Sequence, residues 1–134
     1  MIVVDASVVV ELLMRTDQGR HAKDRLFGGN ATLHAPHLLD VEIAHGLRRL
    51  HAAGQFDANR GREALQDLAA MRICRYPHDL LLTRIWELRD NLTAYDAAYV
   101  ALAEVLRAPL LTCDRRLANA PGHRARVEIL GRPR

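Results

Sequence analysis

The sequence predicts an α/β fold of the three-layer α/β/α kind, with a central, mainly parallel sheet of four to five strands. The alternation of two sequence patterns predicts it. Short apolar runs rich in β-branched residues alternate with longer segments whose apolar residues recur at helical spacing. Such alternation is typical of parallel sheets, which helices cover on both faces. The 134 residues contain no linker, repeat or low-complexity tract, so we expect a single domain over residues 1–134.

The strands are expected where apolar runs are short and bounded by turn residues. Five segments fit: residues 1–4, 31–34, 72–76, 110–113 and 127–130. The last four residues, 131–134, are expected to fray.

Start and stop signals place the helices between the first strands. Ser7 is expected to cap a helix over residues 8–14, followed by a polar turn at residues 16–20. A second helix ends at Gly28-Gly29. Pro36 is expected to open the third helix, which Gly54 ends.

The second half of the chain carries similar signals. Asp57 is expected to cap a helix that ends at Met71, and Pro77 to begin the next. Trp86 of that helix is expected in the core. In the following helix Tyr95 heads an apolar face that continues through Tyr99, Leu102 and Leu106, and Pro109 ends the helix.

Composition indicates the compartment. The two cysteines, Cys74 and Cys113, lie in apolar strand-like runs and are expected to be buried thiols in a reducing, cytoplasmic environment. The N-terminus lacks the pattern of a signal peptide. The longest uncharged apolar run, near residues 97–103, is far shorter than the roughly 20 residues of a membrane span. We expect a soluble protein without a membrane partner.

The basic residues are almost all arginine. Of the 19 basic residues only Lys23 is a lysine, and residues 115–134 hold six arginines against the single acid Glu128. Arginine binds phosphate in a bidentate manner, which favours a nucleic-acid partner. A genomic base composition that favours arginine codons is an equally good explanation. Because aromatic residues are only 4% of the chain, base stacking is not a broad recognition device here.

Four acids are candidates for a site. Asp5 and Asp114 directly follow predicted strands, and Asp96 lies in a first helical turn. Glu42 borders the apolar stripe of the third helix, with Asp40 at the opposite border, and the pattern alone does not choose between these two. Each acid also has a purely structural explanation. Asp96 fits a capping box and Asp114 can cap the turn that follows it.

Together, however, the four acids predict a metal site. Carboxylates gathered at the carboxyl edge of one sheet repel one another unless cations neutralise them. Oxygen ligands without a Cys/His set favour Mg²⁺ or Mn²⁺, which act on phosphate esters by activating a bound water. In this interpretation Asp5 and Asp96 are the main ligands, Asp114 holds a second ion or orients the water, and Glu42 holds metal-bound waters. Three hydroxyls are close enough in sequence to position the acids by hydrogen bonds: Ser7, Thr93 and Thr112.

Other phosphate-handling motifs are missing. The sequence has neither GxGxxG after its first strand nor GxxxxGK[ST]. A haloacid-type phosphatase would need a second acid where Ser7 stands, and a response-regulator receiver would need a late lysine. The histidines are scattered without the spacing of a zinc site, and no nucleophile elbow is present.

The chain resembles a known family, the PIN-domain ribonucleases of the VapC toxin type. Four segments carry the resemblance, in family order: IVVDASVVVELL with Asp5, PHLLDVEIAHGLRR with Glu42, LTAYDAAYVALAE with Asp96 and LLTCDRRLAN with Asp114. The resemblance implies a PIN fold, Mg²⁺- or Mn²⁺-dependent endonucleolytic cleavage of RNA, a homodimer and a VapB-type antitoxin. It also implies that Glu42, not Asp40, belongs to the site.

One departure from the family pattern bears on the site. A further acid or amide often follows the equivalent of Asp114, whereas here Arg115, Arg116 and Leu117 follow, with Asn119 as a substitute to consider. The number of bound metals is therefore open. Arg115 and Arg116 either contact phosphate or belong to the antitoxin interface.

The four ordered acids, together with what the resemblance implies, predict a metal-dependent endoribonuclease toxin. The alternative is a catalytically silent PIN-like module that binds RNA or a protein, which the missing downstream acid favours. A small-molecule phosphatase ranks third.

Overall fold

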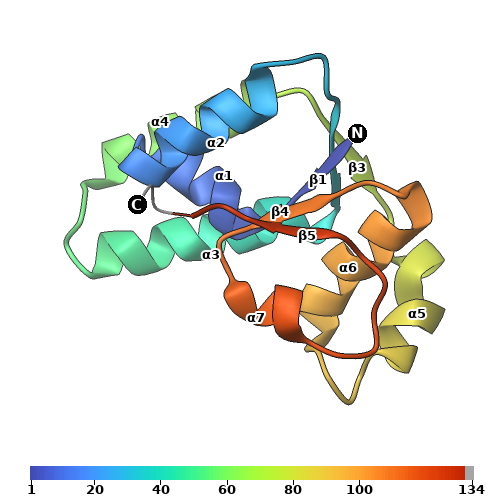
Figure 1. Cartoon of the computed structure of the whole chain (residues 1–134). Coiled ribbons are helices and arrows are strands. Elements are labelled where there is room, and N and C mark those ends of the chain that lie inside the picture. Colours follow the sequence, from blue (N-terminus) through green and yellow to red (C-terminus); the bar gives the residue numbers. More distant parts are fainter. Residues whose placement is uncertain (132–134) are drawn as a thin grey trace.

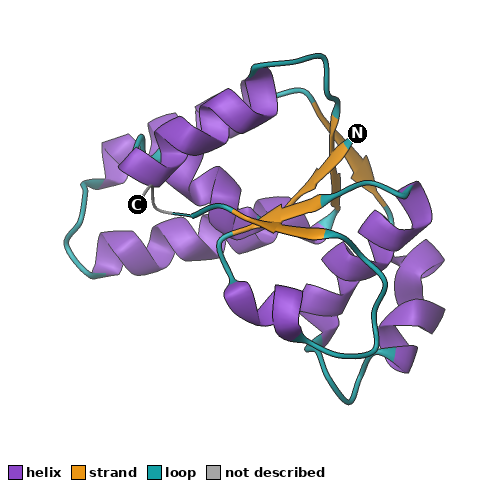
Figure 2. Ribbon diagram, viewed as in Figure 1, coloured by secondary structure: helices purple, strands orange, loops and turns teal. Residues whose placement is uncertain are grey.

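The computed structural model describes residues 1–131 and is built around one five-stranded sheet (Figures 1 and 2). The strands are β1 (Ile2–Val4), β2 (Leu33–Pro36), β3 (Ile73–Tyr76), β4 (Leu110–Thr112) and β5 (Val127–Ile129). Their order across the sheet is β3-β2-β1-β4-β5, and every neighbouring pair is parallel. The predicted α/β fold with a parallel sheet is confirmed.

Helices cover both faces of the sheet (Figure 1). They are α1 (Ala6–Leu13), α2 (Asp17–Phe27), α3 (Leu38–Ala52), α4 (Ala58–Ala70), α5 (Leu82–Glu87), α6 (Ala94–Leu106) and α7 (Arg115–Asn119), with a 3-10 turn, η1 (His78–Leu81), before α5. In the view of Figure 1, α1 to α4 gather on one side of the strands and α5 to α7 on the other. The chain therefore winds outward from β1 in one direction to β3 and then in the other direction to β5.

The core lies where α6 packs on the middle of the sheet. All residues from Ala97 to Ala103 are buried, so this helix is enclosed on every side for two turns. The small alanines let α6 approach closely, and Tyr99 and Leu102 fill the space that remains. Val3 of the central strand β1 and Leu110 of its neighbour β4 are completely buried. This packing fixes where α6 begins, which matters for the site.

Three boundary predictions were wrong. Ser7 lies inside α1, whose N-cap is Asp5, because the Ser7 hydroxyl donates to the Asp5 carboxylate instead of capping the backbone. Residues 17–20 belong to α2, and Thr16 is its N-cap, accepting the N–H of Gly19 at 3.0 Å. Pro36 ends β2 rather than opening α3, since it still pairs with Tyr76 of β3 and α3 begins only at Leu38.

Three burial predictions were also wrong. Trp86 is 68% exposed because α5 is short and turns this residue outward, where the Arg89 guanidinium covers its ring at 4.7 Å. Tyr95 is 65% exposed, because it lies in the first turn of α6, before the enclosed part of the helix begins at Ala97. Cys74 is exposed because β3 is an edge strand and alternate residues point away from the core. Asp57, in contrast, caps α4 as predicted, by accepting the Arg60 N–H.

Within residues 1–131, no helix combines the length and the apolar character that crossing a membrane requires. The fraying expected at the carboxyl terminus falls mainly on residues 132–134, which lie outside the described part.

Candidate active site

The order of the strands brings two of the candidate acids together. Asp5 follows β1 and Asp114 follows β4, and these strands are neighbours with Val4 opposite Leu111. The winding direction of the chain reverses between β1 and β4, and the crevice outside the carboxyl ends of strands at such a reversal is where open α/β sheets bind ligands. Asp5 and Asp114 therefore stand at the edge where this fold places a site.

The other two acids reach the same edge from helices. Asp96 is in the first turn of α6, and Glu42 is in the second turn of α3. The charges act on one another: Asp5 and Asp114 each raise the pKa of Asp96, and Asp5 and Asp96 each raise the pKa of Glu42. The structure thus gathers all four predicted residues into one cluster.

Asp5 is the most enclosed of the four. Burial raises its pKa, and two hydrogen bonds oppose this effect by stabilising the carboxylate. Thr112 Oγ1 donates to Asp5 Oδ2 at 2.7 Å and Ser7 Oγ donates to the same oxygen at 2.8 Å. The other carboxylate oxygen, Oδ1, accepts neither of these bonds.

The same two hydroxyls connect Asp5 to the end of β4. Thr112 Oγ1 also accepts the N–H of Asp114 at 3.1 Å, and Ser7 Oγ accepts the N–H of Cys113 at 3.1 Å. The Thr112 hydroxyl therefore holds both the carboxylate of Asp5 and the backbone of Asp114 in place. The structure places Ser7 and Thr112 beside the acids, as the sequence suggested.

Glu42 and Asp40 have different surroundings although they are two residues apart. Arg75 holds Asp40 in a bidentate pair with N–O distances of 2.6 and 2.8 Å, away from the cluster. Glu42 Oε1 instead accepts a hydrogen bond from the Tyr99 hydroxyl at 2.7 Å, and burial raises its pKa. The geometry therefore assigns Glu42 to the cluster.

Tyr99 is a member of the site that the sequence analysis did not identify. It was expected only as an apolar position on the buried face of its helix. The available signal was its spacing, because Tyr99 lies one turn after Asp96 and so on the same side of α6. Its completely buried ring carries a hydroxyl, and such a group needs a partner.

Asp96 serves its helix and the cluster at once. Thr93 Oγ1 accepts the N–H of Asp96 at 3.1 Å and so caps α6. The carboxylate itself is half-buried, and its pKa is raised first by burial and then by Asp5 and Asp114. The helix-capping explanation and the site explanation therefore do not compete.

Asp114 differs from the others because it has a counter-ion. It is the N-cap of α7, accepting the Arg116 N–H at 2.9 Å, and the Arg116 guanidinium lies against both carboxylate oxygens. This arginine holds the pKa of Asp114 below its ordinary value. Arg115 is exposed, and Leu117 is only 1% exposed and belongs to the core.

As the side chains stand, no three Asp, Glu, His or Cys groups in residues 1–131 are arranged as a ready coordination shell. Three of the four acids nevertheless have raised pKa values, and Arg116 lowers that of Asp96 only weakly compared with the effects that raise it. A cluster with so much like charge favours a cation. Fold and site together define an α/β protein with a carboxylate site at the reversal point of a parallel sheet.

Comparison with known proteins gives this class a family. The family model described as PIN domain matches residues 2–122. The chain is 45% identical over 134 residues to ribonuclease VapC9 of Mycobacterium tuberculosis, covering 98% of this chain and all of that one. It is 42% identical over 132 residues to ribonuclease VapC1 of the same organism, covering 96% of each.

Solved structures agree on the fold. PAE2754 from Pyrobaculum aerophilum is 27% identical, with a TM-score of 0.67 over 94% of this chain and 82% of that chain. A toxin-antitoxin complex from Klebsiella pneumoniae contains a chain with a TM-score of 0.67 at 21% identity, covering 98% of each. The protein therefore belongs to the PIN-domain family, and within it to the VapC ribonucleases.

The Tyr99–Glu42 contact makes a first prediction. Tyr99→Phe removes the donor to Glu42, so the pKa of Glu42 should rise further, and the free energy of unfolding should fall by about 1–2 kcal/mol. The carboxyl carbon of Glu42 followed by NMR during a pH titration reports the first effect. Tyr95→Phe, in the same helix and exposed, is the control. Identical Glu42 titrations in the two variants would contradict the assignment.

Proposed function

We propose that this protein is a metal-dependent endoribonuclease and the toxin of a toxin-antitoxin pair. It cleaves RNA phosphodiester bonds with a water molecule that a metal ion activates, and the acids that hold the ion are Asp5, Glu42, Asp96 and Asp114. The observation that carries the proposal is the position of these acids at the reversal point of the sheet, where burial first, and then the charges of neighbouring acids, raise the pKa values of Asp5, Glu42 and Asp96. The membership in the VapC ribonucleases supports the choice of RNA.

The donor set fits Mg²⁺, and Mn²⁺ as a second choice. All four groups offer carboxylate oxygens, which these hard cations prefer. Asp5 and Asp96 are the main ligands in this proposal, Asp114 supports a second ion or the water, and Glu42 holds bound waters. When bound, the metal lowers the pKa of a water and neutralises charge that develops on the phosphate.

The remaining polar residues prepare the site for this role. Thr112 and Ser7 hold one oxygen of Asp5 and so fix the direction of the other. Tyr99 orients Glu42 in the same way, and Thr93 fixes the start of α6. We assign Arg115 and Arg116 to phosphate contacts of the substrate, beside the acids.

We further propose a VapB-type antitoxin as partner, a homodimer and a cytoplasmic site of action. An apolar groove of about 420 Å³ supports a protein partner. Leu12, Leu13, Phe27 and Met71 supply its apolar lining, at one end of α1 and α2. Tight cover of such a groove by an amphipathic segment is a common mode of protein recognition.

Cleavage of total cellular RNA tests the function. Antitoxin-free protein is incubated with Mg²⁺, with Mn²⁺ and with EDTA. We expect discrete fragments with either metal and none with EDTA. The buried Leu117, where the family often has an acid, favours the alternative of a silent binding module. Absence of cleavage by folded protein in both metals, with RNA still bound, would establish that alternative.

Arg116 gives a second prediction. Its guanidinium occupies both oxygens of Asp114, so it competes with a metal for that carboxylate. Arg116→Ala should let the pKa of Asp114 return toward its ordinary value and tighten Mn²⁺ binding by about 3- to 10-fold. Isothermal titration calorimetry without RNA measures this affinity. Arg115→Ala removes the neighbouring exposed charge and is the control. Weaker binding in the Arg116 variant would show that the arginine does not compete.

A further inference from the structure

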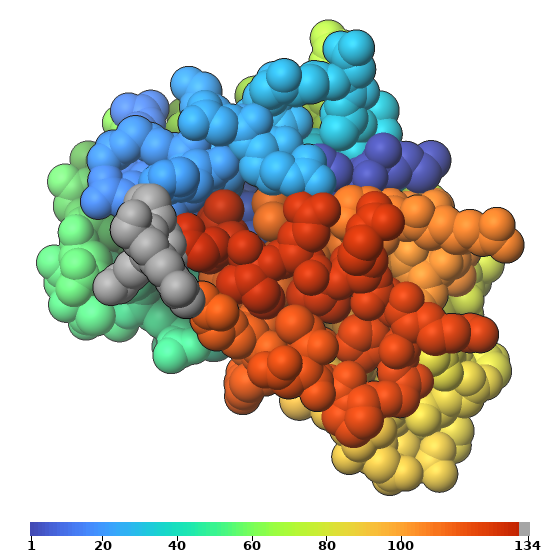
Figure 3. All heavy atoms as spheres, viewed as in Figure 1, coloured from blue at the N-terminus to red at the C-terminus, as the bar shows by residue number. Residues whose placement is uncertain are grey.

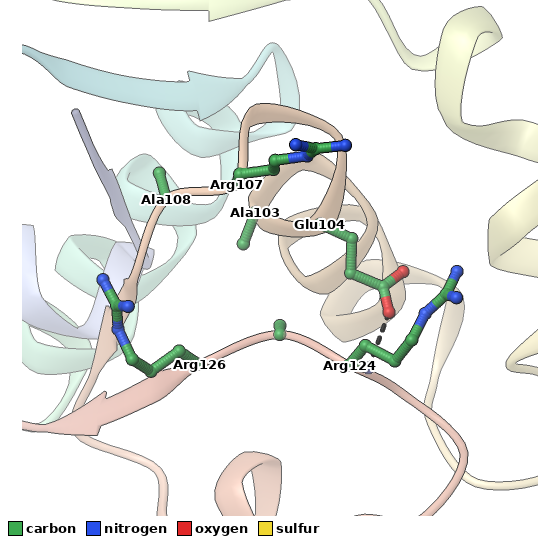
Figure 4. Close-up of a pocket in the computed structure, with 7 residues that line it drawn as sticks. Ala103, Glu104, Arg107, Ala108, Arg124 and Arg126 are labelled. Atoms are coloured by element: carbon green, nitrogen blue, oxygen red, sulfur yellow. Dashed lines mark hydrogen bonds between the residues drawn. The ribbon is translucent and has the colours of Figure 1, made fainter.

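A second pocket lies at the opposite edge of the sheet, where β4 and β5 begin. Its volume is about 470 Å³, and it is formed by the end of α6 and the segment that leads into β5. Figure 3 shows these two parts of the chain, orange and red, side by side on the surface. The lining contains three arginines, Arg107, Arg124 and Arg126, one acid, Glu104, and three alanines (Figure 4).

The acid of this pocket is already neutralised. Arg84 binds both oxygens of Glu104 at 2.7 and 3.0 Å, and the Arg124 backbone N–H adds a third bond at 2.7 Å. These contacts hold the pKa of Glu104 below its ordinary value. Glu104 therefore has little capacity left to bind a guanidinium group of the lining.

The three arginines keep their side chains available. Among residues 1–131, the guanidinium groups of Arg107, Arg124 and Arg126 have no hydrogen-bond or ion-pair partner. Figure 4 shows Arg107 at the end of the helix and the other two on the segment that passes below it. The pocket therefore presents three arginine side chains, of which only Arg124 lies close enough to Glu104 to lower the pKa of that acid, and no apolar side chain larger than alanine.

Two features keep the pocket in place. Arg84 also donates to the Gly122 carbonyl at 3.0 Å, and the Arg126 carbonyl accepts the Leu110 N–H at 2.9 Å, so both ends of the segment that leads into β5 are held by hydrogen bonds.

The backbone of Arg107 is unusual, with a φ angle of 51° in the left-handed region at the end of α6. Glycine is the usual residue in this conformation, and arginine accepts it at a cost. The local backbone thus does not explain why arginine stands here.

We propose that this pocket binds a phosphate group of the RNA strand, at a point remote from the bond that is cleaved. Arg107 follows Asp96 by eleven residues along α6, which is about 17 Å. Guanidinium groups match phosphate oxygens in charge and in geometry. A peptide partner would need an apolar anchor, which the alanine-lined walls do not offer. The inference rests on the proposed function, because it assigns part of the same substrate to this pocket.

Measuring RNA binding under conditions that prevent cleavage tests the assignment of this pocket. All proteins carry Asp96→Asn and are kept in EDTA, and fluorescence anisotropy follows a labelled single-stranded RNA. The triple variant Arg107→Gln, Arg124→Gln, Arg126→Gln should bind at least about 10-fold more weakly, with a salt slope lower by about 0.7, the value for one phosphate of a single strand. The control, Arg48→Gln, Arg49→Gln, Arg72→Gln, makes the same change in net charge at exposed arginines elsewhere. Equal losses in both triple variants would overturn the proposal.

Further arms separate the sources of phosphate and guard against misfolding. Pyrophosphate should compete with RNA for the starting protein but not for the triple variant. If pyrophosphate binding depends on the three arginines while RNA binding does not, the ligand is a small phosphate and the RNA assignment is wrong. If poly-glutamate binding alone depends on them, the pocket is an acidic-peptide site and the proposal fails.

The variant Arg107→Gly provides an independent check. Glycine relieves the left-handed backbone, so melting temperature should stay the same or rise, whereas RNA binding should weaken about 3-fold. Unchanged RNA binding would count against the pocket. Every arm measures binding by the inactivated protein, so the pocket is tested separately from the nuclease. If these arms show pocket-dependent binding while the unaltered protein fails to cleave RNA with Mg²⁺ or Mn²⁺, the nuclease is refuted and the pocket stands.

Discussion

Asp96→Asn should lower metal-dependent RNA cleavage by about 10³-fold or more while leaving the fold intact. Asparagine keeps the shape of the side chain and the capped backbone N–H, so Thr93 can still begin α6. It removes the charge that, in the proposed site, holds the metal, and losing one such electrostatic element commonly costs at least 10²–10³-fold. Initial rates on one defined RNA, at saturating Mg²⁺, measure the effect. Asp5→Asn should lower the cleavage rate to a similar extent.

The control for this loss is Asp90→Asn, an exposed acid in the turn after α5. It should cleave RNA at the rate of the unaltered protein. A wild-type rate for Asp96→Asn would remove Asp96 from the site, and equal losses in Asp90→Asn would point to a general effect of charge.

Asp96→Asn should slow cleavage without lowering the stability of the metal-free protein. The folded-state pKa of Asp96 is raised, so the folded protein holds a proton there more tightly than the unfolded chain does. Stability therefore falls as pH rises from the unfolded pKa through the folded pKa, and the ionised acid opposes folding at neutral pH. Without metal, Asp96→Asn should be at least as stable as the wild type. Metal should raise the melting temperature of the wild type more than that of the variant.

Leu102→Ala should reduce the free energy of unfolding by about 2–5 kcal/mol. This side chain is 1% exposed and lies in the part of α6 that is enclosed on all sides. Truncation leaves a cavity in the middle of the core. Since a domain of this kind is stable by about 5–15 kcal/mol, the loss is a large share of the total. Urea denaturation followed by circular dichroism measures it.

Val105→Ala is the matched control in the same helix. Val105 is 67% exposed, so its truncation should change stability by no more than about 0.5 kcal/mol. Similar losses for the two variants would mean that α6 is not the centre of the core.

Much of the fold could be predicted because it depends on local patterns. The apolar runs that became β1 and β4 are short, uninterrupted and followed at once by an acid, and parallel sheets bury such runs completely. The burial of Trp86 and Tyr95 was predicted wrongly for a related reason. A large apolar side chain is usually buried. Whether a particular one is exposed depends on which elements pack around it, and no local sequence pattern reveals this packing.

The assembly of the site was less accessible to sequence reasoning. Which of Asp40 and Glu42 faces the cluster depends on Arg75. This arginine lies in β3, far from Asp40 in the sequence, and binds the Asp40 carboxylate. The double role of Thr112 depends likewise on the pairing of β1 with β4. Such contacts join residues far apart in sequence, so only the three-dimensional arrangement identifies them.

The most direct test of the proposed chemistry is the structure of the ends that cleavage creates. RNA is cut in Mg²⁺ in water enriched in ¹⁸O, and the fragments are analysed by mass spectrometry. Attack by a metal-activated water predicts ends that carry a phosphate monoester with one ¹⁸O atom and a free hydroxyl on the other side. Fragments that end in 2′,3′-cyclic phosphate without ¹⁸O would show that the ribose hydroxyl is the nucleophile, and would contradict the assignment of the four acids to a water-activating metal site.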